Sequence, residues 1–273
     1  MKILLYGNKG VGKTTFWVSV CGMTWQAGGR GRVRCLNPQA QQRLTAAWEA
    51  LTNRMSYPPS NEKLTEEFYE FCQTGDNGER QTFIFQCTDI PGELISRPDD
   101  RDPELIRLKI RLRQANVIVL FLDAPSIFAE DFCEEQMYDM FAYLYQYGDA
   151  EGKQLMILPL VSRFDLAAAA GLPCSWKEQI DALLWPLEKM AEGNPNIILE
   201  PRCISAGIAN YDRQQEAFER LMAYGLFLSE EERRKKKDKK ADTGRSVGQR
   251  TLLDRLFHSG RKENTGGRTI QKP

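Results

Sequence analysis

Short apolar runs alternate with amphipathic stretches along most of this chain. The runs at residues 2–6, 117–122 and 155–161 are apolar without interruption, which is typical of strands buried on both faces of a sheet. Between the runs, apolar residues recur at helical spacing, as at Leu44, Trp48 and Leu51. Strands that alternate with helices predict an α/β fold, with a mostly parallel sheet and helices on both of its faces.

Two aromatic-rich runs, at residues 67–72 and 81–87, flank a turn of Gly, Asp and Asn, and they predict one antiparallel hairpin. We also predict strands at residues 33–36 and 197–204, and helices at residues 15–25, 39–54, 101–114, 128–147, 176–190 and 214–228. The helix at residues 128–147 has more aromatic rings than one buried face uses, so either the core or a partner surface takes the excess.

These elements predict one α/β domain over residues 1–228, with an extra strand and helix inserted at about residues 28–56, and a separate tail over residues 229–273. The tail carries fourteen basic and seven acidic side chains, although the whole chain has a formal net charge of zero. Its composition is typical of a flexible segment. Two interpretations stay open: the tail contacts an anionic surface, or it is simply solvated.

A glycine-rich loop lies between the first strand and the first helix, with the sequence Gly7-Asn8-Lys9-Gly10-Val11-Gly12-Lys13-Thr14-Thr15. Glycines permit backbone conformations in which successive N–H groups point at phosphate oxygens, and the following helix adds the positive end of its dipole. Lys13 can then reach the β- and γ-phosphates, and the Thr14 hydroxyl can bind Mg²⁺. The segment from Asn8 to Thr15 therefore predicts a nucleotide-binding site.

A nucleoside triphosphatase also needs a second oxygen ligand for Mg²⁺ and a group that senses the γ-phosphate. Asp89 ends the second strand of the hairpin, and Gly92 follows three residues later. This pair predicts a carboxylate for the metal and a backbone N–H for the γ-phosphate. Asp123, after the strand at residues 117–122, is the alternative metal ligand. A strand-ending turn capped by Asp89 is the structural alternative.

The composition of the chain argues against several other kinds of site and against a membrane span. The seven cysteines lie singly, and the one histidine, His258, is in the tail, so we expect neither a disulfide framework nor a zinc site nor histidine-based catalysis within the fold. No apolar run reaches the roughly 20 residues of a membrane span, and the first predicted strand lies where a signal peptide would begin. We therefore predict a cytoplasmic protein with no transmembrane segment.

The order of these motifs resembles that of TRAFAC-class P-loop GTPases, which share the Ras-like fold, over roughly residues 1–228. Ser162-Arg163-Phe164-Asp165 and Ser205-Ala206-Gly207 each follow an apolar strand, as the fourth and fifth family motifs do. Asp89-Ile90-Pro91-Gly92-Glu93 and Pro58-Pro59-Ser60 are most similar to segments of bacterial double-GTPase-like proteins. The resemblance implies binding of GTP and GDP with Mg²⁺, and hydrolysis of GTP in a molecular switch.

The resemblance also implies which residues contact the base. Asp165 stands where the family has an aspartate that accepts hydrogen bonds from the guanine N1–H and amino group. Arg163 stands where a lysine stem packs on the base, and Ser205 and Ala206 stand where a backbone N–H contacts the guanine O6. Ser162 and Arg163 replace the usual Asn or Thr and Lys, so the strictness of the guanine preference stays open.

Two further departures concern hydrolysis. Glu93 stands where many family members have the Gln that orients the attacking water, and Lys9 occupies a position where many have a small residue. We predict that Lys13 and Glu93 act in catalysis, and that hydrolysis is slow without a partner because a carboxylate also repels the γ-phosphate. A solvated Glu93 is the alternative.

Other switch residues are harder to choose. We predict that Ser60 supplies the switch hydroxyl that binds Mg²⁺, with Thr65 as the alternative. Arg97 and Arg101 are candidates for a charge-neutralising finger, or else they are solvated side chains.

Two other functions stay open. One is a nucleotide-dependent interaction or assembly subunit with little intrinsic hydrolysis, which Glu93 and Lys9 favour, and whose output is contact with a protein effector or partner complex. The other is a P-loop small-molecule kinase with residues 107–113 as a basic lid. The Asp-x-x-Gly segment and Asp165 argue against the kinase.

Overall fold

The computed structural model describes residues 1–26, 31–54, 56–58, 63–74, 78–96, 101–148, 153–205 and 214–236. The chain divides into two units, Met1–Leu226 and Phe227–Pro273. A helix over residues 214–236 begins in the first unit. The fold described below is that of the first unit.

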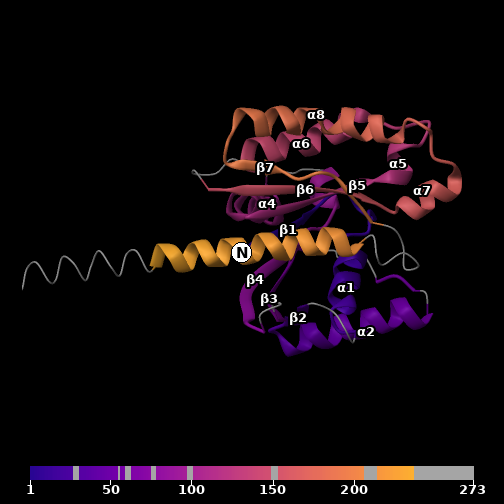
Figure 1. The fold of residues 1–273 in the computed structure, drawn as a ribbon. Coiled ribbons are helices and arrows are strands. Elements are labelled where there is room, and N and C mark those ends of the chain that lie inside the picture. The colour runs from indigo at the N-terminus through magenta and orange to yellow at the C-terminus, as the bar shows by residue number, and fades with distance from the viewer. Residues whose placement is uncertain are drawn as a thin grey trace, which may run out of the picture. The chain divides into compact units, whose positions relative to one another are not determined.

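The first unit is built on an eight-stranded sheet with the order β2-β3-β4-β1-β5-β6-β7, in which β8 also pairs with β6 (Figure 1). The strands are β1 (Lys2–Tyr6), β2 (Gly31–Cys35), β3 (Thr65–Thr74), β4 (Arg80–Asp89), β5 (Val117–Asp123), β6 (Leu155–Ser162), β7 (Ile197–Leu199) and β8 (Cys203–Ile204). Strand β3 is antiparallel to both β2 and β4, and the other pairings are parallel. The predicted mostly parallel sheet with one antiparallel hairpin is confirmed.

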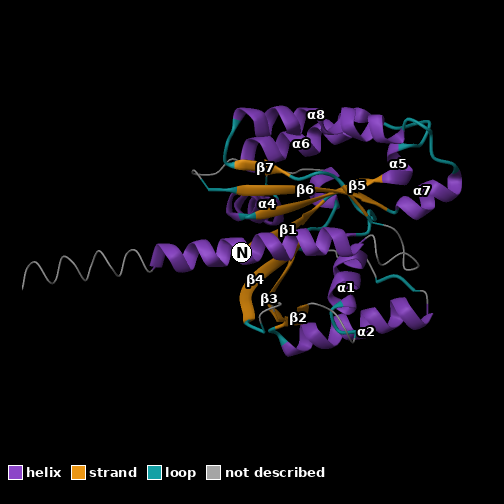
Figure 2. Ribbon diagram, viewed as in Figure 1, coloured by secondary structure: helices purple, strands orange, loops and turns teal. Residues whose placement is uncertain are grey.

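Helices cover both faces of this sheet, as Figure 2 shows. They are α1 (Lys13–Met23), α2 (Pro38–Arg54), α3 (Glu93–Ser96), α4 (Pro103–Gln114), α5 (Ala124–Ile127), α6 (Glu134–Gly148), α7 (Phe164–Ala170) and α8 (Trp176–Gly193). Apolar side chains of α4, α6 and α8 pack on one face, and those of α1 and residues 214–226 pack on the other. Helix α2 packs on α1 through Trp48 and Leu51.

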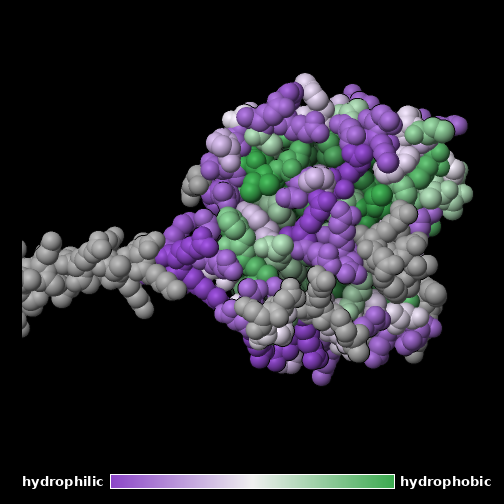
Figure 3. Space-filling model, in the orientation of Figure 1, coloured by the Kyte–Doolittle hydropathy of each residue, from purple (hydrophilic) through white to green (hydrophobic). Residues whose placement is uncertain are grey.

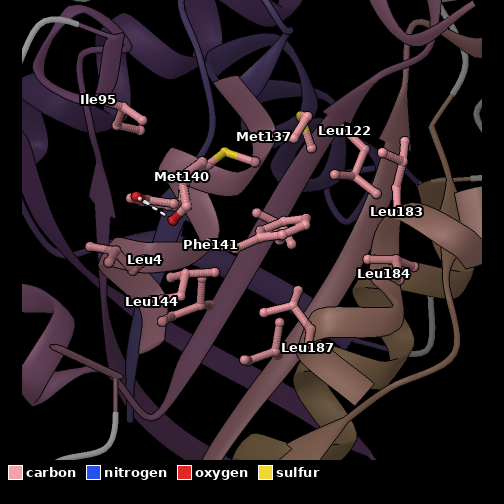
Figure 4. Close-up of a cluster of buried hydrophobic side chains, with 14 of the residues drawn as sticks. Leu4, Ile95, Leu122, Met137, Met140, Phe141, Leu144, Leu183, Leu184 and Leu187 are labelled. Carbon is pink, nitrogen blue, oxygen red and sulfur yellow. Dashed lines mark hydrogen bonds between the residues drawn. The ribbon is translucent and has the colours of Figure 1, made fainter. Parts of the chain in front are cut away.

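On the face covered by α4, α6 and α8, one hydrophobic core joins these helices to the sheet. Figure 4 shows Phe141 and Leu144 of α6 lying near Leu122 of β5 and Leu187 of α8. The hydroxyl of Tyr6, which is fully buried in β1, donates to the Met140 carbonyl at 3.1 Å. This bond satisfies a polar group that would otherwise cost free energy to bury.

The helix predicted at residues 128–147 is wrong at its start. Helix α5 ends at Ile127, Phe128 is its C-cap, and α6 begins at Glu134. Pro125 in the first turn of α5 starts that short helix directly after β5, which the aromatic pattern did not indicate. Most of the aromatic excess lies in the core or against it, whereas Tyr138 and Tyr145 are exposed.

Strand β2 lies at an edge of the sheet, and side chains cover its outer backbone groups. The Val33 N–H donates to Thr24 Oγ1 at 3.0 Å, and its carbonyl accepts from Trp25 Nε1 at 2.8 Å. The Cys35 N–H donates to Gln41 Oε1 at 2.8 Å. These bonds occupy groups that would otherwise be free to pair with another strand.

The surface of the first unit mixes hydrophobic patches with hydrophilic side chains (Figure 3). Large apolar residues that remain exposed include Phe68 and Ile84 on the hairpin and Trp185 on α8. Over the described residues, none of the helices combines the length and the apolar character that crossing a membrane requires.

Candidate functional site

A cavity of about 390 Å³ lies at the carboxyl ends of β1, β4, β6 and β8, where ligands bind in open α/β sheets. Its lining contains Lys9, Gly10, Val11, Gly12, Lys13, Thr14, Thr15, Phe16, Tyr57, Pro58, Asp89, Ile90, Pro91, Gly92, Glu93, Ser162, Arg163, Asp165, Leu166, Ser205 and Gln214. Residues from four separate motifs of the sequence therefore meet in one cavity. Asn8 does not line it, and Ser60 and Ala206 lie outside the described residues.

The loop after β1 has the backbone form that the glycines were predicted to permit. Gly10 has a φ of 76° and Gly12 a φ of 91°, which are left-handed values that favour glycine. Gly12 is the N-cap of α1, so the first N–H groups of that helix have no intrahelical partner and face the loop. Such a helix start attracts anions.

Lys13 is buried at the centre of the loop. Its ammonium donates to the carbonyls of Gly7 and Asn8, each at 2.8 Å, and only 7% of the residue is exposed. Burial lowers the pKa of Lys13 to about 8, against the opposing charges of Asp89 and Glu93. An anionic phosphate beside this ammonium would stabilise its charged form.

Thr14 and Asp89 bring two oxygen ligands together. The Thr14 hydroxyl donates to Asp89 Oδ2 at 2.6 Å, and Asp89 is 8% exposed at the end of β4. Within the described residues no cluster of three acidic, histidine or cysteine side chains surrounds a potential metal position. This donor set fits Mg²⁺, which commonly takes one or two protein oxygens and completes its shell with phosphate and water.

The Asp-x-x-Gly segment packs directly on the phosphate loop. A Cβ on Gly92 would lie 1.9 Å from the backbone N of Lys9, so only glycine allows this approach. The Lys9 ammonium also lies 2.6 Å from Glu93 Oε1. This hydrogen bond and the bond to its own backbone lower the pKa of Glu93, so the side chain is a carboxylate at neutral pH.

Asp165 and Arg163 also line the cavity: Arg163 is the N-cap of α7, directly after β6, and Asp165 lies in the first turn of α7. Asp165 Oδ1 is buried and accepts no hydrogen bond from the residues that the structure describes. The Ser205 N–H already donates to the Val161 carbonyl at 2.8 Å, so this N–H is not available to a base. The backbone donor implied at this position would have to be that of Ala206.

Asp123, the alternative metal ligand, is bonded to Arg163 instead of facing the cavity. Its carboxylate accepts from Arg163 Nε at 2.6 Å and from the second guanidinium nitrogen, and it does not line the cavity. The register of β5 on β6 explains this arrangement, because it places Asp123 opposite Ser162, next to Arg163.

The alternative switch hydroxyl and the candidates for a charge-neutralising finger and a basic lid are not part of the cavity lining where the structure describes them. Thr65 begins β3, where it is paired with Asp89 of β4, and it is exposed and outside the lining. Arg101 is also exposed and outside the lining, whereas Arg97 lies outside the described residues. Residues 107–113 belong to α4, whose Leu105, Leu108 and Leu112 are buried in the core, and none of them lines the cavity.

Sequence reasoning missed several residues of the lining. Gln214, at the start of the helix over residues 214–236, is 2% exposed and lies at the cavity. Tyr57 and Leu166 are exposed apolar residues at its rim. Nothing in the spacing of these residues distinguishes them, because they reach the cavity only through the tertiary fold.

Neither a protein-family model nor a curated protein sequence matches this chain. Among solved structures, the chain is similar to the FeoB G-domain from Methanococcus jannaschii, with 18% identity, a TM-score of 0.37, and coverage of 82% of this chain and 96% of that one. It is also similar to Era in complex with MgGDPNP and nucleotides 1506-1542 of 16S ribosomal RNA, with 14% identity, a TM-score of 0.36, and coverage of 80% and 55%.

A variant of Aquifex aeolicus Era bound to GDP and AlF4⁻ gives 14% identity, a TM-score of 0.35 and the same coverage of 80% and 55%. This chain therefore spans about half of each Era chain. At these identities and TM-scores the similarities assign neither residues nor an activity to this chain, so the functional argument rests on the cavity itself.

Proposed function

We propose that this chain binds GTP with Mg²⁺ and hydrolyses it to GDP and phosphate, acting as a molecular switch. One observation carries the proposal. The glycine-rich loop, the buried Lys13 and Asp165 line a single cavity, and Asp165 Oδ1 is a buried acceptor oxygen. A nucleoside triphosphate has the matching chemistry, with anionic phosphates at one end and a base with N–H donors at the other.

At the phosphate end, the chain's own groups supply charge and direction. The left-handed glycines and the start of α1 present N–H groups to phosphate oxygens, and the Lys13 ammonium neutralises their negative charge. Thr14 and Asp89 would hold Mg²⁺, which when bound supplies further neutralisation of the phosphate charge. Positioning and charge neutralisation are the main demands of phosphoryl transfer.

At the base end, Asp165 supports a preference for guanine over adenine. Guanine presents N1–H and an exocyclic amine side by side, whereas adenine has an unprotonated N1 that would face the carboxylate. A buried acceptor with no donor is costly, so the site favours the base that provides donors.

The position of Glu93 supports slow intrinsic hydrolysis. Its carboxylate is held by Lys9, and it must leave that ion pair before it can orient a water molecule. A protein partner that withdraws Lys9 or adds a cation would therefore speed the reaction. A cytoplasmic location and an effector protein are further predictions. An anionic contact of the tail is also a prediction, since residues 237–273 lie outside the described part of the chain.

A time course of phosphate release from GTP with Mg²⁺ tests this proposal. We expect slow release by the wild type, and loss of release in Lys13→Ala. Lys189→Ala is the matched control, because that lysine is exposed on α8, away from the cavity. Tight GTP binding without release would support the nucleotide-dependent assembly subunit, and absence of nucleotide binding would contradict both functions.

A further inference from the structure

Asp123 does not line the cavity, but its carboxylate accepts hydrogen bonds from Arg163, which does. We propose that Asp123 is a positioning residue for base recognition: it holds the Arg163 guanidinium away from Asp165, so that the Asp165 carboxylate stays available to the base. This inference rests on the proposed function, and it concerns how the same site selects guanine.

The contacts of Asp123 are those of a built anchor. Arg163 Nε donates to Asp123 Oδ1 at 2.6 Å, and a terminal guanidinium nitrogen donates to Oδ2. The Ser126 hydroxyl donates to the same Oδ2. Asp123 is only 8% exposed, and a two-point guanidinium–carboxylate pair fixes direction as well as charge.

The backbone of Arg163 is consistent with a fixed position. Its φ of 51° is the one positive value among the described residues other than glycine, and a left-handed conformation is unfavourable for a residue with a side chain. Such conformations persist where surrounding contacts determine them, and they concentrate at functional sites. The bonds to Asp123 are contacts of that kind.

With its guanidinium held at Asp123, the rest of Arg163 is left beside the cavity. Its Cγ would lie 4.0 Å from a Cβ built on Gly12, which places the aliphatic stem next to the phosphate loop. Arg163 also lines the cavity, whereas Asp123 does not. The stem can therefore pack on a bound base while the charged end points elsewhere.

The Arg163 guanidinium must be held because the Asp165 carboxylate is close to it in the sequence and lines the same cavity. Arg163 and Asp165 are two residues apart and line the same cavity, and Asp165 Oδ1 accepts no hydrogen bond among the described residues. A guanidinium released from Asp123 would be attracted to that carboxylate and would occupy the oxygens that the base needs. Asp123 thus separates two roles, a packing surface on Arg163 and an acceptor on Asp165.

Affinities for GDP, inosine diphosphate and ADP test the proposal, because inosine lacks the amino group of guanine and adenine lacks the N1–H. They are measured by calorimetry on the wild type, on Asp123→Asn and on the double variant Asp123→Asn/Arg163→Met. We expect Asp123→Asn to reduce the ratio of GDP to ADP affinity by about tenfold or more, which is the value of a hydrogen bond to a charged group. Discrimination between GDP and inosine diphosphate should fall with it.

The double variant distinguishes this role from a structural one. The methionine at position 163 lacks the guanidinium but keeps a linear apolar stem. The Asp165 carboxylate is then available to the base again, so the guanine preference should return. Lys189→Ala is the control, because this lysine is exposed on α8 and outside the cavity lining, and it should leave the ratio within about twofold.

Each outcome decides a separate point. A wild type without guanine preference contradicts the proposed function itself. A wild type that prefers guanine, together with an Asp123→Asn variant that keeps the preference, overturns the role of Asp123 alone. The double variant leaves no unpaired charge at this position, so it provides the comparison if the single variant is unstable. Loss of guanine preference in the double variant also overturns the proposal.

Discussion

The ammonium of Lys9 lies 2.6 Å from the carboxylate of Glu93 and joins the phosphate loop to the first residue of α3. The two side chains are 61% and 44% exposed, so the pair adds little to folding stability. Its significance lies in its position beside the phosphate loop, on which Gly92 packs. A γ-phosphate near this pair would attract Lys9 and repel Glu93, so triphosphate binding and the ion pair compete.

Glu93→Gln should therefore favour the triphosphate. Without the carboxylate, Lys9 can turn toward the γ-phosphate and the repulsion is gone, so the ratio of affinities for a non-hydrolysable GTP analogue and GDP should rise by about two- to fivefold. Titration of both nucleotides measures the ratio. The same substitution made in a Lys9→Ala background should have a smaller effect, and equal effects in the two backgrounds would show that the residues are not coupled.

The buried Lys13 predicts that nucleotide affinity depends on pH. Burial lowers the pKa of Lys13 in the free protein to about 8, and bound phosphate raises it again. Binding then takes up a proton, so affinity is full below pH 8 and falls as the pH rises above 8. Calorimetry of GDP binding from pH 7 to 9.5 checks this dependence. Lys13→Met, which binds more weakly, should lack it, and the same slope in both proteins would assign it to another group.

Gly92→Ala should disturb the site without disturbing the core. A Cβ at this position would lie 1.9 Å from the backbone N of Lys9, so the segment must move away from the phosphate loop. We expect weaker binding of the triphosphate than of the diphosphate, and slower phosphate release. Gly193→Ala at the end of α8 is the control, since a Cβ there meets no atom within 4 Å. Equal behaviour of the two variants would contradict the close approach.

Leu144 tests the packing of α6 in the core that it shares with α4, α8 and the sheet. The residue is fully buried, so Leu144→Ala should reduce the free energy of unfolding by about 2–5 kcal/mol in urea denaturation. Its neighbour Tyr145 is 70% exposed, and Tyr145→Ala should change that free energy by less than about 0.5 kcal/mol. Similar losses in both variants would mean that α6 faces the core differently.

The sequence predicts the strands of the sheet and the phosphate loop because their patterns lie within short segments of the chain. The apolar runs of β1, β5 and β6 need no partner to be recognised, and the glycine loop carries its spacing with it. The break between α5 and α6 was missed because Phe128 and Phe132 continue the aromatic pattern while packing on the core from a loop.

The rest of the site depends on contacts between distant segments. The Asp123–Arg163 pair exists because β5 and β6 align Asp123 with Ser162, a register that neither strand specifies alone. Lys9 and Glu93 are 84 positions apart, and they meet because β1 and β4 are neighbours in the sheet. Gln214 reaches the cavity from a helix whose pattern indicates only its buried face.

The central claim is that the cavity binds guanine nucleotides through Asp165. The most direct test is the affinity of the wild type and of Asp165→Ala for GTP and ATP with Mg²⁺. The account predicts that the wild type binds GTP more tightly than ATP by about tenfold or more, and that Asp165→Ala removes this preference while ATP binding changes little. Equal or tighter binding of ATP by the wild type, or an unchanged preference in Asp165→Ala, would contradict it.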